Sequence, residues 1–282
     1  MTQPSGQAAY TLNDGRVLPR IGFGTYPLRG EDGIRAIVSA LDTGYRLLDT
    51  AVMYGNEAEV GEAIRRSGVR REEVLVTSKI RGDQHAYDDA IASTYASLDR
   101  LGLDYLDLHL IHWPNPRRGK YVEAWRALVE LQRRGLVRSI GVSNFTGAQL
   151  ARIIDETGVT PAVNQIELHP LFPQVEMRAV NAELGIQTEA WSPLGKRLAQ
   201  YEAPAVGEPA TRLGVSPAQV ILRWHLQLGT LPVPKSADPL RQAANLDVFG
   251  WELTSDEMAA ITALGRPDGR LFGGDPDTHE EP

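Results

Sequence analysis

The stretch Leu106–His112, which reads LDLHLIH, is the most informative part of this 282-residue chain for its fold. Its leucines stand at every second position, and the side chains of a strand alternate between its two faces. Leu106, Leu108, Leu110 and His112 therefore share one face, which suits the inside of a curled sheet. Asp107 and His109 lie on the opposite face and are expected to hydrogen-bond in a helical layer. His112 is the last residue on the apolar face, so we expect its side chain to face the opening of the curled sheet at the carboxyl-terminal end.

Similar stretches recur along the chain and alternate with longer segments of helical spacing. The predicted strands are Arg20–Tyr26, Arg46–Thr50, Val74–Ile80, Leu106–His112, Val137–Ser143, Ala162–Glu167, Ile186–Trp191 and Leu231–Lys235. The predicted helices between and after them are Gly33–Asp42, Glu57–Arg66, Ala86–Leu101, Val122–Arg134, Gly147–Glu156, Val175–Leu184 and Pro239–Asn245. This alternation indicates βαβ units and a parallel sheet. Eight units in about 220 residues favour an α/β fold of the (β/α)8 TIM-barrel type, although open eight-stranded sheets also exist.

Three elements are predicted in addition to the eightfold pattern. Tyr10–Leu18 reads as an N-terminal β-hairpin with Asp14-Gly15 at its turn. Two extra helices are expected, one over Pro217–Leu228 and one opening with the capping box Thr254–Glu257. Residues 266–282 are rich in Gly, Pro and Asp and are expected to form an irregular tail. We find no repeat or linker, so residues 1–282 are predicted to form a single domain.

Composition excludes several classes of protein. With 42% hydrophobic and 23% charged residues the chain resembles an ordinary globular protein. A net charge of −7 argues against a nucleic-acid binder. The absence of cysteine excludes disulfides and thiolate nucleophiles. No secretory signal is recognisable at the N-terminus, and no apolar run approaches the roughly 20 residues that cross a bilayer. A cytoplasmic protein that binds neither membranes nor nucleic acid is expected.

Polar or aromatic residues stand at the end of every predicted strand. They are Thr25, Tyr26, Asp49, Lys79, His112, Ser143, Asn144, Gln165, Trp191, Ser192, Lys235 and Ser236. The active site of a barrel lies at the carboxyl ends of its strands. Eight such ends in succession therefore predict one site.

Four residues form a set that is complete for proton donation to a carbonyl oxygen. The phenol of Tyr54 is a poor acid at its ordinary pKa near 10, but an ammonium such as Lys79 lowers a phenol pKa. Asp49 would hold that ammonium charged, and a neutral His112 imidazole would orient the carbonyl by one hydrogen bond. No side chain supplies hydride, so a nicotinamide cofactor is implied. Taken singly, each residue could equally be a cap, a surface group or a packing residue.

Two other kinds of protein stay open from the residues alone. A metal-dependent barrel hydrolase would need converging His and carboxylate ligands, but Asp107 and His109 point away from His112, and no metal site is predicted. A barrel that binds a cofactor without turnover, as a sensor or structural protein, would not need all four residues of the set.

The chain resembles the aldo-keto reductases, and the match runs from about Tyr10 to Gly265. The motifs that carry it are GYRLLDTA over Gly44–Ala51, YGNE over Tyr54–Glu57, GVSNF over Gly141–Phe145, and VPKS over Val233–Ser236 with Arg241 and Asn245. WSPL at Trp191–Leu194 and GDPDT at Gly274–Thr278 are most similar to the bacterial 2,5-diketo-D-gluconate reductase branch.

The resemblance implies an NADPH-dependent oxidoreductase that reduces aldehydes or ketones to alcohols on a (β/α)8 barrel. In this family Tyr54 would be the general acid, Asp49 and Lys79 would tune it, and His112 would orient the carbonyl. The expected cofactor-binding residues are Thr25, Tyr26, Ser143, Asn144, Gln165, Trp191, Ser192, Leu194, Lys235, Ser236, Arg241 and Asn245. Lys235 and Arg241 would favour the 2′-phosphate of NADPH.

The substrate pocket is expected between Tyr26, Met53, Trp113 and Phe272. These walls are more aromatic than charged and suit a small-molecule carbonyl better than a polyanion. Ala244 and His279 depart from the residues that relatives often carry, which affects the adenine contact and the substrate, not the reaction. Nothing in the sequence calls for an oligomer, and a monomer is expected.

Overall fold

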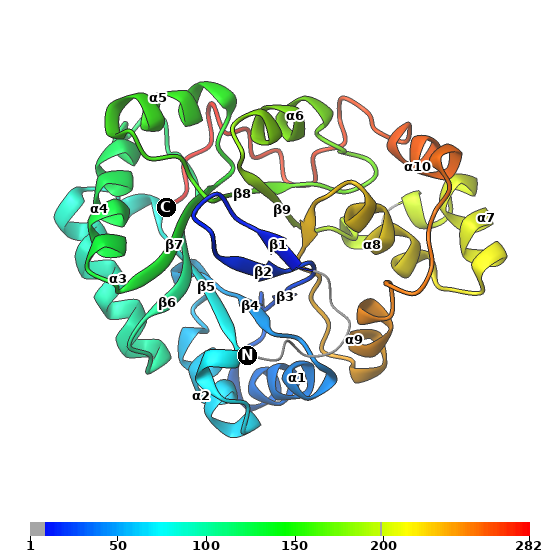
Figure 1. Ribbon diagram of the computed structural model, residues 1–282, viewed down its shortest axis with the longest axis horizontal. Helices are drawn as coiled ribbons and strands as arrows, with labels where there is room; N and C mark the ends of the chain where they lie inside the picture. Colours follow the sequence, from blue (N-terminus) through cyan, green and yellow to red (C-terminus); the bar gives the residue numbers. More distant parts are fainter. Residues whose placement is uncertain (1–8, 198) are drawn as a thin grey trace.

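The computed structural model describes residues 9–197 and 199–282, and its centre is an eight-stranded parallel sheet (Figure 1). The strands are β3 (Phe23–Gly24), β4 (Leu47–Asp49), β5 (Leu75–Ile80), β6 (Leu106–Ile111), β7 (Val137–Ser143), β8 (Val163–Glu167), β9 (Gln187–Trp191) and β10 (Leu231–Pro232), hydrogen-bonded in this order. Beyond the ladder, Gly22 N donates to Pro232 O at 3.0 Å and Gly24 N to Pro234 O at 3.1 Å. The sheet is curled, as in a (β/α)8 barrel.

Two strands are shorter than predicted. Only Phe23–Gly24 of the predicted strand Arg20–Tyr26 forms β3, and only Leu231–Pro232 of Leu231–Lys235 forms β10. Pro232 and Pro234 lack the N–H that a continuous ladder requires, so regular pairing ends there.

Helices surround the sheet, and every predicted one is present (Figure 1). Those that follow the strands in turn are α1 (Gly30–Thr43), α2 (Glu57–Ser67), α3 (Tyr87–Leu101), α4 (Tyr121–Arg133), α5 (Gly147–Thr157), α6 (Val175–Glu183), α8 (Pro217–Gln227) and α9 (Pro239–Leu246). Two more helices complete the set: α7 (Pro204–Leu213) and α10 (Ser255–Thr262).

One predicted addition proves to be part of the regular pattern. Helix α8, expected as an extra helix, packs on β10 and is the helix of the unit between β9 and β10. The extra helix there is α7, which packs on α8 and α10 and was not predicted. It begins with Pro204 and contains Pro209, residues that are typical of loops.

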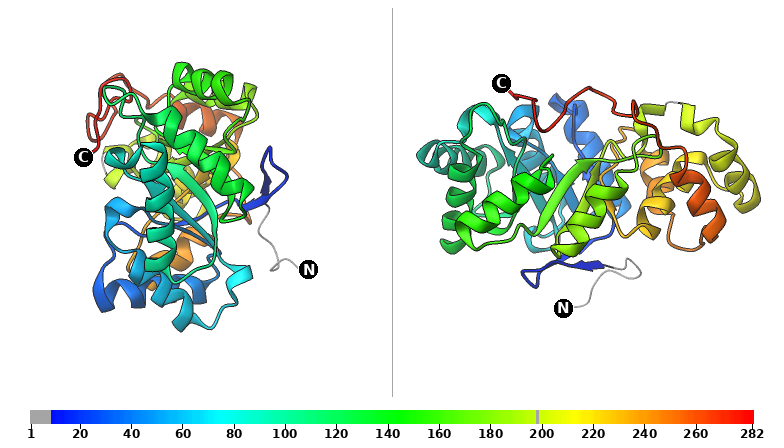
Figure 2. Two further views of the ribbon diagram at one scale, coloured as in Figure 1. Left: turned by 90° about the vertical axis from the view of Figure 1, so that its left-hand side faces the viewer. Right: turned by 90° about the horizontal axis from the view of Figure 1, so that it is seen from above.

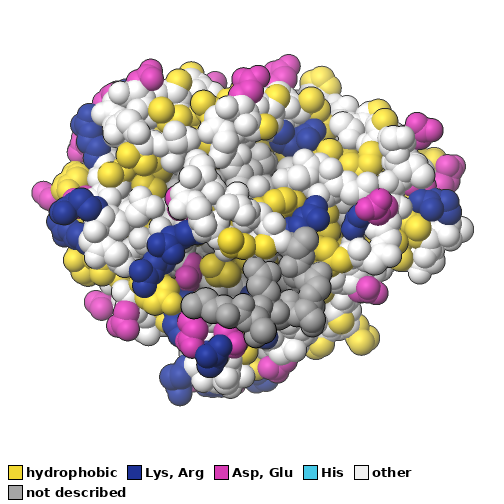
Figure 3. Space-filling model, in the orientation of Figure 1, with side chains coloured by type: hydrophobic (Ala, Val, Ile, Leu, Met, Phe, Trp, Pro, Cys, Tyr) yellow, Lys and Arg dark blue, Asp and Glu magenta, His cyan; other side chains and the backbone are white. Residues whose placement is uncertain are grey.

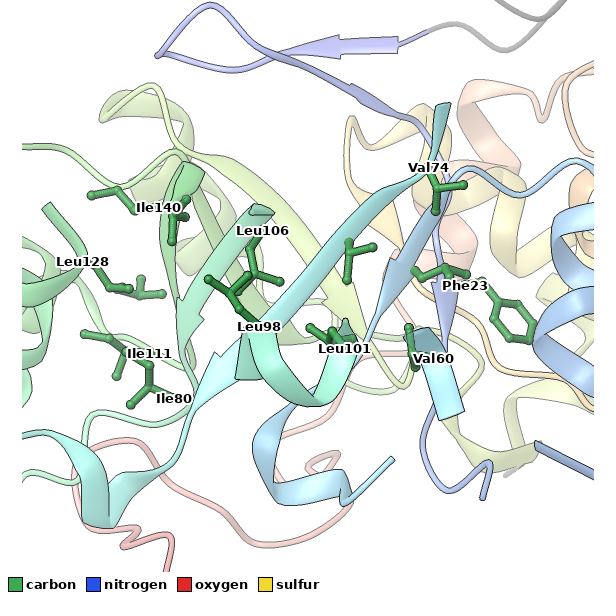
Figure 4. Close-up of a cluster of buried hydrophobic side chains, with 14 of the residues drawn as sticks. Phe23, Val60, Val74, Ile80, Leu98, Leu101, Leu106, Ile111, Leu128 and Ile140 are labelled. Atoms are coloured by element: carbon green, nitrogen blue, oxygen red, sulfur yellow. The ribbon is translucent and has the colours of Figure 1, made fainter. Parts of the chain in front are cut away.

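The core has an inner and an outer part. Inside the sheet, Leu108 and Leu110 pack with Leu12 and Leu18 of the hairpin. Outside it, strand and helix residues interlock in the cluster that Figure 4 shows, where Ile80, Ile111 and Ile140 meet Leu98, Leu101 and Leu128. Leu106 belongs to this outer cluster, which corrects the expectation that it faces inward with the other leucines. It is the first residue of β6 and lies near Leu98 of α3 (Figure 4).

The outward orientation predicted for Asp107 and His109 is confirmed. The Asp107 carboxylate accepts hydrogen bonds from Arg71 at 2.7 Å and from Val76 N at 2.9 Å. His109 contacts Ser78 O at 2.9 Å and Thr94 Oγ1 of α3 at 3.2 Å. Burial lowers the pKa of His109 to about 4, so this imidazole is neutral at pH 7 and structural.

The two ends of the sheet are covered by different segments (Figure 2). The predicted hairpin is present as β1 (Ala9–Thr11) and β2 (Val17–Pro19) and lies across one end. The tail over residues 266–282 contains no helix or strand, as expected, and runs across the opposite end. On the face with the hairpin, acidic and basic side chains are interspersed (Figure 3). Within the described ranges, no helix is long and apolar enough to cross a membrane.

Candidate active site

The position of Tyr54 is fixed by hydrogen bonds between the loops that follow β3 and β4. Asn56 donates to Thr25 O at 3.1 Å and accepts from Thr50 Oγ1 at 2.7 Å. Tyr54 ends a short 3-10 helix, η1 (Val52–Tyr54), after which Gly55 takes the left-handed conformation with φ +61°. The Arg29 guanidinium donates to Tyr54 O, with Nε at 3.0 Å. These contacts hold the phenol at the carboxyl end of the sheet.

Lys79 connects the predicted carboxylate to the predicted acid. Its Nζ donates to Asp49 Oδ1 at 2.6 Å, to Asp49 Oδ2 at 2.8 Å and to Thr50 O at 3.0 Å. The same Nζ lies 3.3 Å from Tyr54 OH. Both partners of the ion pair are buried, with Lys79 fully inaccessible to solvent. The ammonium therefore lies between the carboxylate and the phenol, as the sequence predicted.

The net pKa of Tyr54 corrects one expectation. Burial raises it to about 12, and the charge of Lys79 offsets only part of that rise. The expected lowering is wrong because desolvation of the phenolate outweighs the ammonium. Burial also acts against the charge on Lys79, but Asp49 and Tyr54 more than compensate and raise its pKa. At neutral pH the site thus holds a protonated phenol beside a charged lysine.

Gln165 extends this network to a second buried carboxyl. Its Nε2 donates to Asp49 Oδ1 and to Glu189 Oε1, both at 2.9 Å. Glu189 Oε2 is buried without a hydrogen-bond partner, and burial together with the Asp49 charge raises the pKa of Glu189 to about 8. Because both of these bonds use Nε2, Oε1 of Gln165 is left for a ligand in the cavity that the residue lines.

His112 directly follows β6, and its ring lies edge-on to that of Tyr54, at 75° between planes and 5.7 Å between centroids. Its Nδ1 lies 2.5 Å from Oε1 of Glu281, a residue of the tail. This is an ion-pair distance when the imidazole is protonated. The sequence predicted the imidazole at this position but not its acidic neighbour.

A cavity of about 1400 Å³ opens above these residues. The expected cofactor-binding residues that line it are Thr25, Tyr26, Asn144, Gln165, Trp191, Ser192, Leu194, Lys235, Ser236, Arg241 and Asn245. Ser143 does not line it: its hydroxyl donates to Gln165 O at 2.8 Å and accepts from Asn144 at 3.0 Å, behind the wall. Trp191 Nε1 donates to Asn144 Oδ1 at 2.8 Å, which fixes the indole at the cavity edge.

One end of the cavity is suited to a phosphate. Lys235 and Ser236 precede α9, and Arg241 lies in its first turn. Asp238 caps this helix by accepting from Leu240 N at 2.9 Å, and its other oxygen lies 3.4 Å from Arg241 Nε. Two cations and a hydroxyl at a helix N-terminus are suited to bind a phosphate dianion.

The four predicted substrate-pocket residues also line the cavity: Tyr26, Met53, Trp113 and Phe272. The Tyr26 ring lies 5.1 Å from that of Tyr54 and is largely exposed. The ring centroids of Phe272 and Trp191 lie 5.8 Å apart. The Lys196 ammonium lies over the Phe272 ring, 4.0 Å from its centroid. The wall is aromatic, as expected.

Residues 20–266 match the model of the Aldo/keto reductase family. The chain belongs to this family. It is 58% identical, over 96% of its length and 97% of the relative, to 2,5-diketo-D-gluconic acid reductase B of Corynebacterium sp. (strain SHS752001). It is 46% identical, over 94% of its length and 96% of the relative, to methylglyoxal reductase DkgA of Escherichia coli (strain K12).

Two solved structures have the same fold. A mutant of Gox0644 in complex with NADPH superposes with a TM-score of 0.93 at 43% identity, covering 98% of this chain and 99% of that one. The Bombyx mori aldo-keto reductase in complex with NADP superposes with a TM-score of 0.87 at 34% identity, covering 93% of this chain and 94% of that one. The family resemblance and the prediction of an oxidoreductase are thereby confirmed.

Residues of this aldo/keto reductase site that were not predicted include Glu189, Lys196 and Glu281. Glu189 stands two positions before Trp191 and so on the same face of β9, a signal that alternation could have revealed. Lys196 and Glu281 lie in irregular segments whose path has no periodicity. Among the described residues, no group of three or more His, Asp and Glu side chains could hold a metal ion.

Proposed function

We propose that this protein reduces small aldehydes and ketones to alcohols with NADPH, with Tyr54 as the general acid. The observation that carries the proposal is the Lys79 ammonium, which contacts the Asp49 carboxylate at 2.6 Å and the Tyr54 hydroxyl at 3.3 Å. A surface role for the lysine does not fit its complete burial. A packing role for Tyr54 would not require a charged partner at its oxygen.

The side chains present suit NADPH. The residues that line the cavity extend from Tyr54 to Arg241. At the Arg241 end, Lys235 and Arg241 are available to bind the 2′-phosphate. Trp191 presents an indole plane beside Gln165 and Asn144, which suit a planar carboxamide-bearing ring. Bound NADPH supplies the hydride that no side chain can provide. Ser143 then acts indirectly, through the positions of Asn144 and Gln165.

The residues around the carbonyl divide the remaining work. Tyr54 is protonated at neutral pH because burial raises its pKa to about 12, so its hydroxyl proton is available for transfer to the carbonyl oxygen. Lys79 stabilises the phenolate that this transfer leaves behind, and Asp49 keeps the ammonium in place. His112, whose ring packs edge-on against that of Tyr54, orients the oxygen.

The substrate class follows from the walls. Tyr26, Trp113 and Phe272 favour an aldehyde or a modest ketone over a polyanion. The names of two relatives, a 2,5-diketo-D-gluconic acid reductase and a methylglyoxal reductase, both denote small carbonyl compounds. The proposal includes a closed (β/α)8 barrel, supported by the bonds from Gly22 and Gly24 to the last strand. It also includes a cytoplasmic, single-domain monomer that binds no nucleic acid.

The experiment is consumption of NADPH, followed by its absorbance, with a panel of aldehydes and ketones. We expect turnover with several small carbonyls and none with Tyr54→Phe. If no carbonyl is reduced although NADPH quenches tryptophan fluorescence, the protein is a cofactor-binding module and the proposal is wrong.

A further inference from the structure

The tail brings a carboxylate to the side of His112 that faces away from the cavity. Glu281 is 4% exposed, and its Oε1 lies 2.5 Å from His112 Nδ1. Its Oε2 accepts a hydrogen bond from Gly82 N at 3.0 Å. Glu281 does not line the cavity, so it can reach a substrate only through the imidazole.

The surroundings of Glu281 form a site built for it. The buried Asn115 amide binds the Glu281 backbone on both sides: Nδ2 donates to Glu281 O at 2.7 Å, and Oδ1 accepts from Glu281 N at 3.3 Å. A Cβ on Gly82 would lie 2.1 Å from Asn115 Nδ2 and 2.7 Å from Glu281 O. Only glycine leaves room for the tail at this position.

The contact determines which atoms of the His112 ring carry protons. A carboxylate oxygen 2.5 Å from Nδ1 requires a proton between the two atoms, because two lone pairs would repel at this distance, and the lowered pKa of Glu281 places that proton on Nδ1. Nε2 is then the only ring nitrogen left for a ligand. If the ring is neutral, Nε2 has a lone pair and cannot donate to a carbonyl oxygen. If the ring is a cation, Nε2 carries a proton and can donate it.

We propose that Glu281 is a positioning residue of the reduction: its carboxylate pairs with His112 as a cation, so that Nε2–H donates to the carbonyl oxygen. This inference rests on the proposed function and replaces the neutral imidazole expected from the sequence. A cationic donor is also the stronger one for an oxygen that gains negative charge.

The charges around the pair are consistent with this role. The pKa of Glu281 is lowered, because attraction to His112 and its hydrogen bonds more than offset the effect of burial. The Tyr54 ring packs edge-on against the imidazole, with the Lys79–Asp49 pair behind the phenol, and His85 is near enough to interact electrostatically with His112. Burial lowers the pKa of His85 to about 4, which leaves it neutral at pH 7. Glu281 is thus the anion placed to pair with His112.

Kinetics of three variants test the proposal. Glu281→Gln keeps the shape and removes the charge; we expect kcat and kcat/KM to fall together by about 10- to 100-fold, the range for a lost hydrogen bond to a charged group. Glu281→Asp keeps the charge and should recover part of the loss. Glu280→Gln is the matched control, because Glu280 accepts from Arg117 N at 2.6 Å, away from the imidazole, and should leave kcat unchanged. Wild-type kcat in Glu281→Gln, with unchanged NADPH affinity, overturns the proposal.

Nitrogen NMR of the imidazoles gives a readout that a merely structural role would not change. His112 signals are identified by their loss in His112→Gln. We expect both ring nitrogens of His112 to be protonated in the wild-type NADPH complex, and one of them to lose its proton in Glu281→Gln. An unprotonated Nδ1 or Nε2 in the wild type overturns the inference even if carbonyls are reduced. If the pair is found but no carbonyl is reduced, the proposed function fails while the pairing of Glu281 with His112 stands.

Discussion

The Nζ of Lys79 lies 3.3 Å from the hydroxyl of Tyr54, whose proton the proposed reduction transfers to the carbonyl oxygen. Replacing Tyr54 by Phe removes that proton but keeps the ring that packs beside Tyr26 and His112. We expect kcat to fall by about 100- to 10,000-fold, the usual contribution of a general acid. The Kd for NADPH, from tryptophan quenching, should change less than about twofold. Wild-type kcat in this variant would rule out the role of Tyr54.

The buried ion pair predicts a test by stability. Lys79→Met leaves the Asp49 carboxylate buried without its cation, and breaking such a pair costs about 3–5 kcal/mol. Urea denaturation of the wild type and the variant measures this loss. The double variant Lys79→Met/Asp49→Leu should recover most of it, because no uncompensated charge remains. Equal stability of the single and double variants would show that the pair is solvated.

Glu189 predicts a pH dependence of stability. Its pKa rises from 4.5 to about 8 on burial, so between these values the folded protein holds a proton that the unfolded chain has released. The free energy of unfolding therefore falls as pH rises through this window, by up to about 1.4 kcal/mol per pH unit. Denaturation at several pH values, with Glu189→Gln as the reference, measures the difference. A constant difference between the two proteins from pH 5 to pH 8 would contradict it.

The phosphate end of the cavity predicts the choice of cofactor. Arg241→Ala and Lys235→Ala should each weaken NADPH binding by about 10- to 100-fold, since each removes a charged hydrogen-bond donor. The affinity for NADH, which lacks the 2′-phosphate, should change little. Fluorescence titrations with both cofactors give the ratio of affinities. The loss for NADPH should shrink as salt is added; an equal loss for both cofactors would place the phosphate elsewhere.

Removal of metal ions distinguishes the reductase from a metal-dependent hydrolase. We expect dialysis against a chelator to leave carbonyl reduction unchanged, because the proposed proton donor and hydride source use no metal. Loss of activity that returns with an added divalent cation would support the hydrolase instead. Activity assays before and after dialysis suffice for this comparison.

The sequence predicted the strands, the helices around them and the polar strand ends, since alternation and helical spacing report which face of an element is buried. It could not predict α7, whose Pro204 and Pro209 resemble a loop, because tertiary packing on α8 and α10 overrides local propensity. The net pKa of Tyr54 could not be predicted either, because motifs indicate the neighbouring ammonium but not how far the phenol is buried from water.

The part of the site that sequence patterns describe least is the tail. It has neither helix nor strand, and contacts such as Gln149 Nε2 to Pro276 O at 3.1 Å attach it to the rest of the molecule. Yet it contributes Phe272 to the pocket wall and Glu281 to the imidazole. Mutations in this one short segment can therefore change which compounds are accepted and how fast they react, while the scaffold stays intact. During divergence of duplicated genes, such a segment offers a direct route to new substrates.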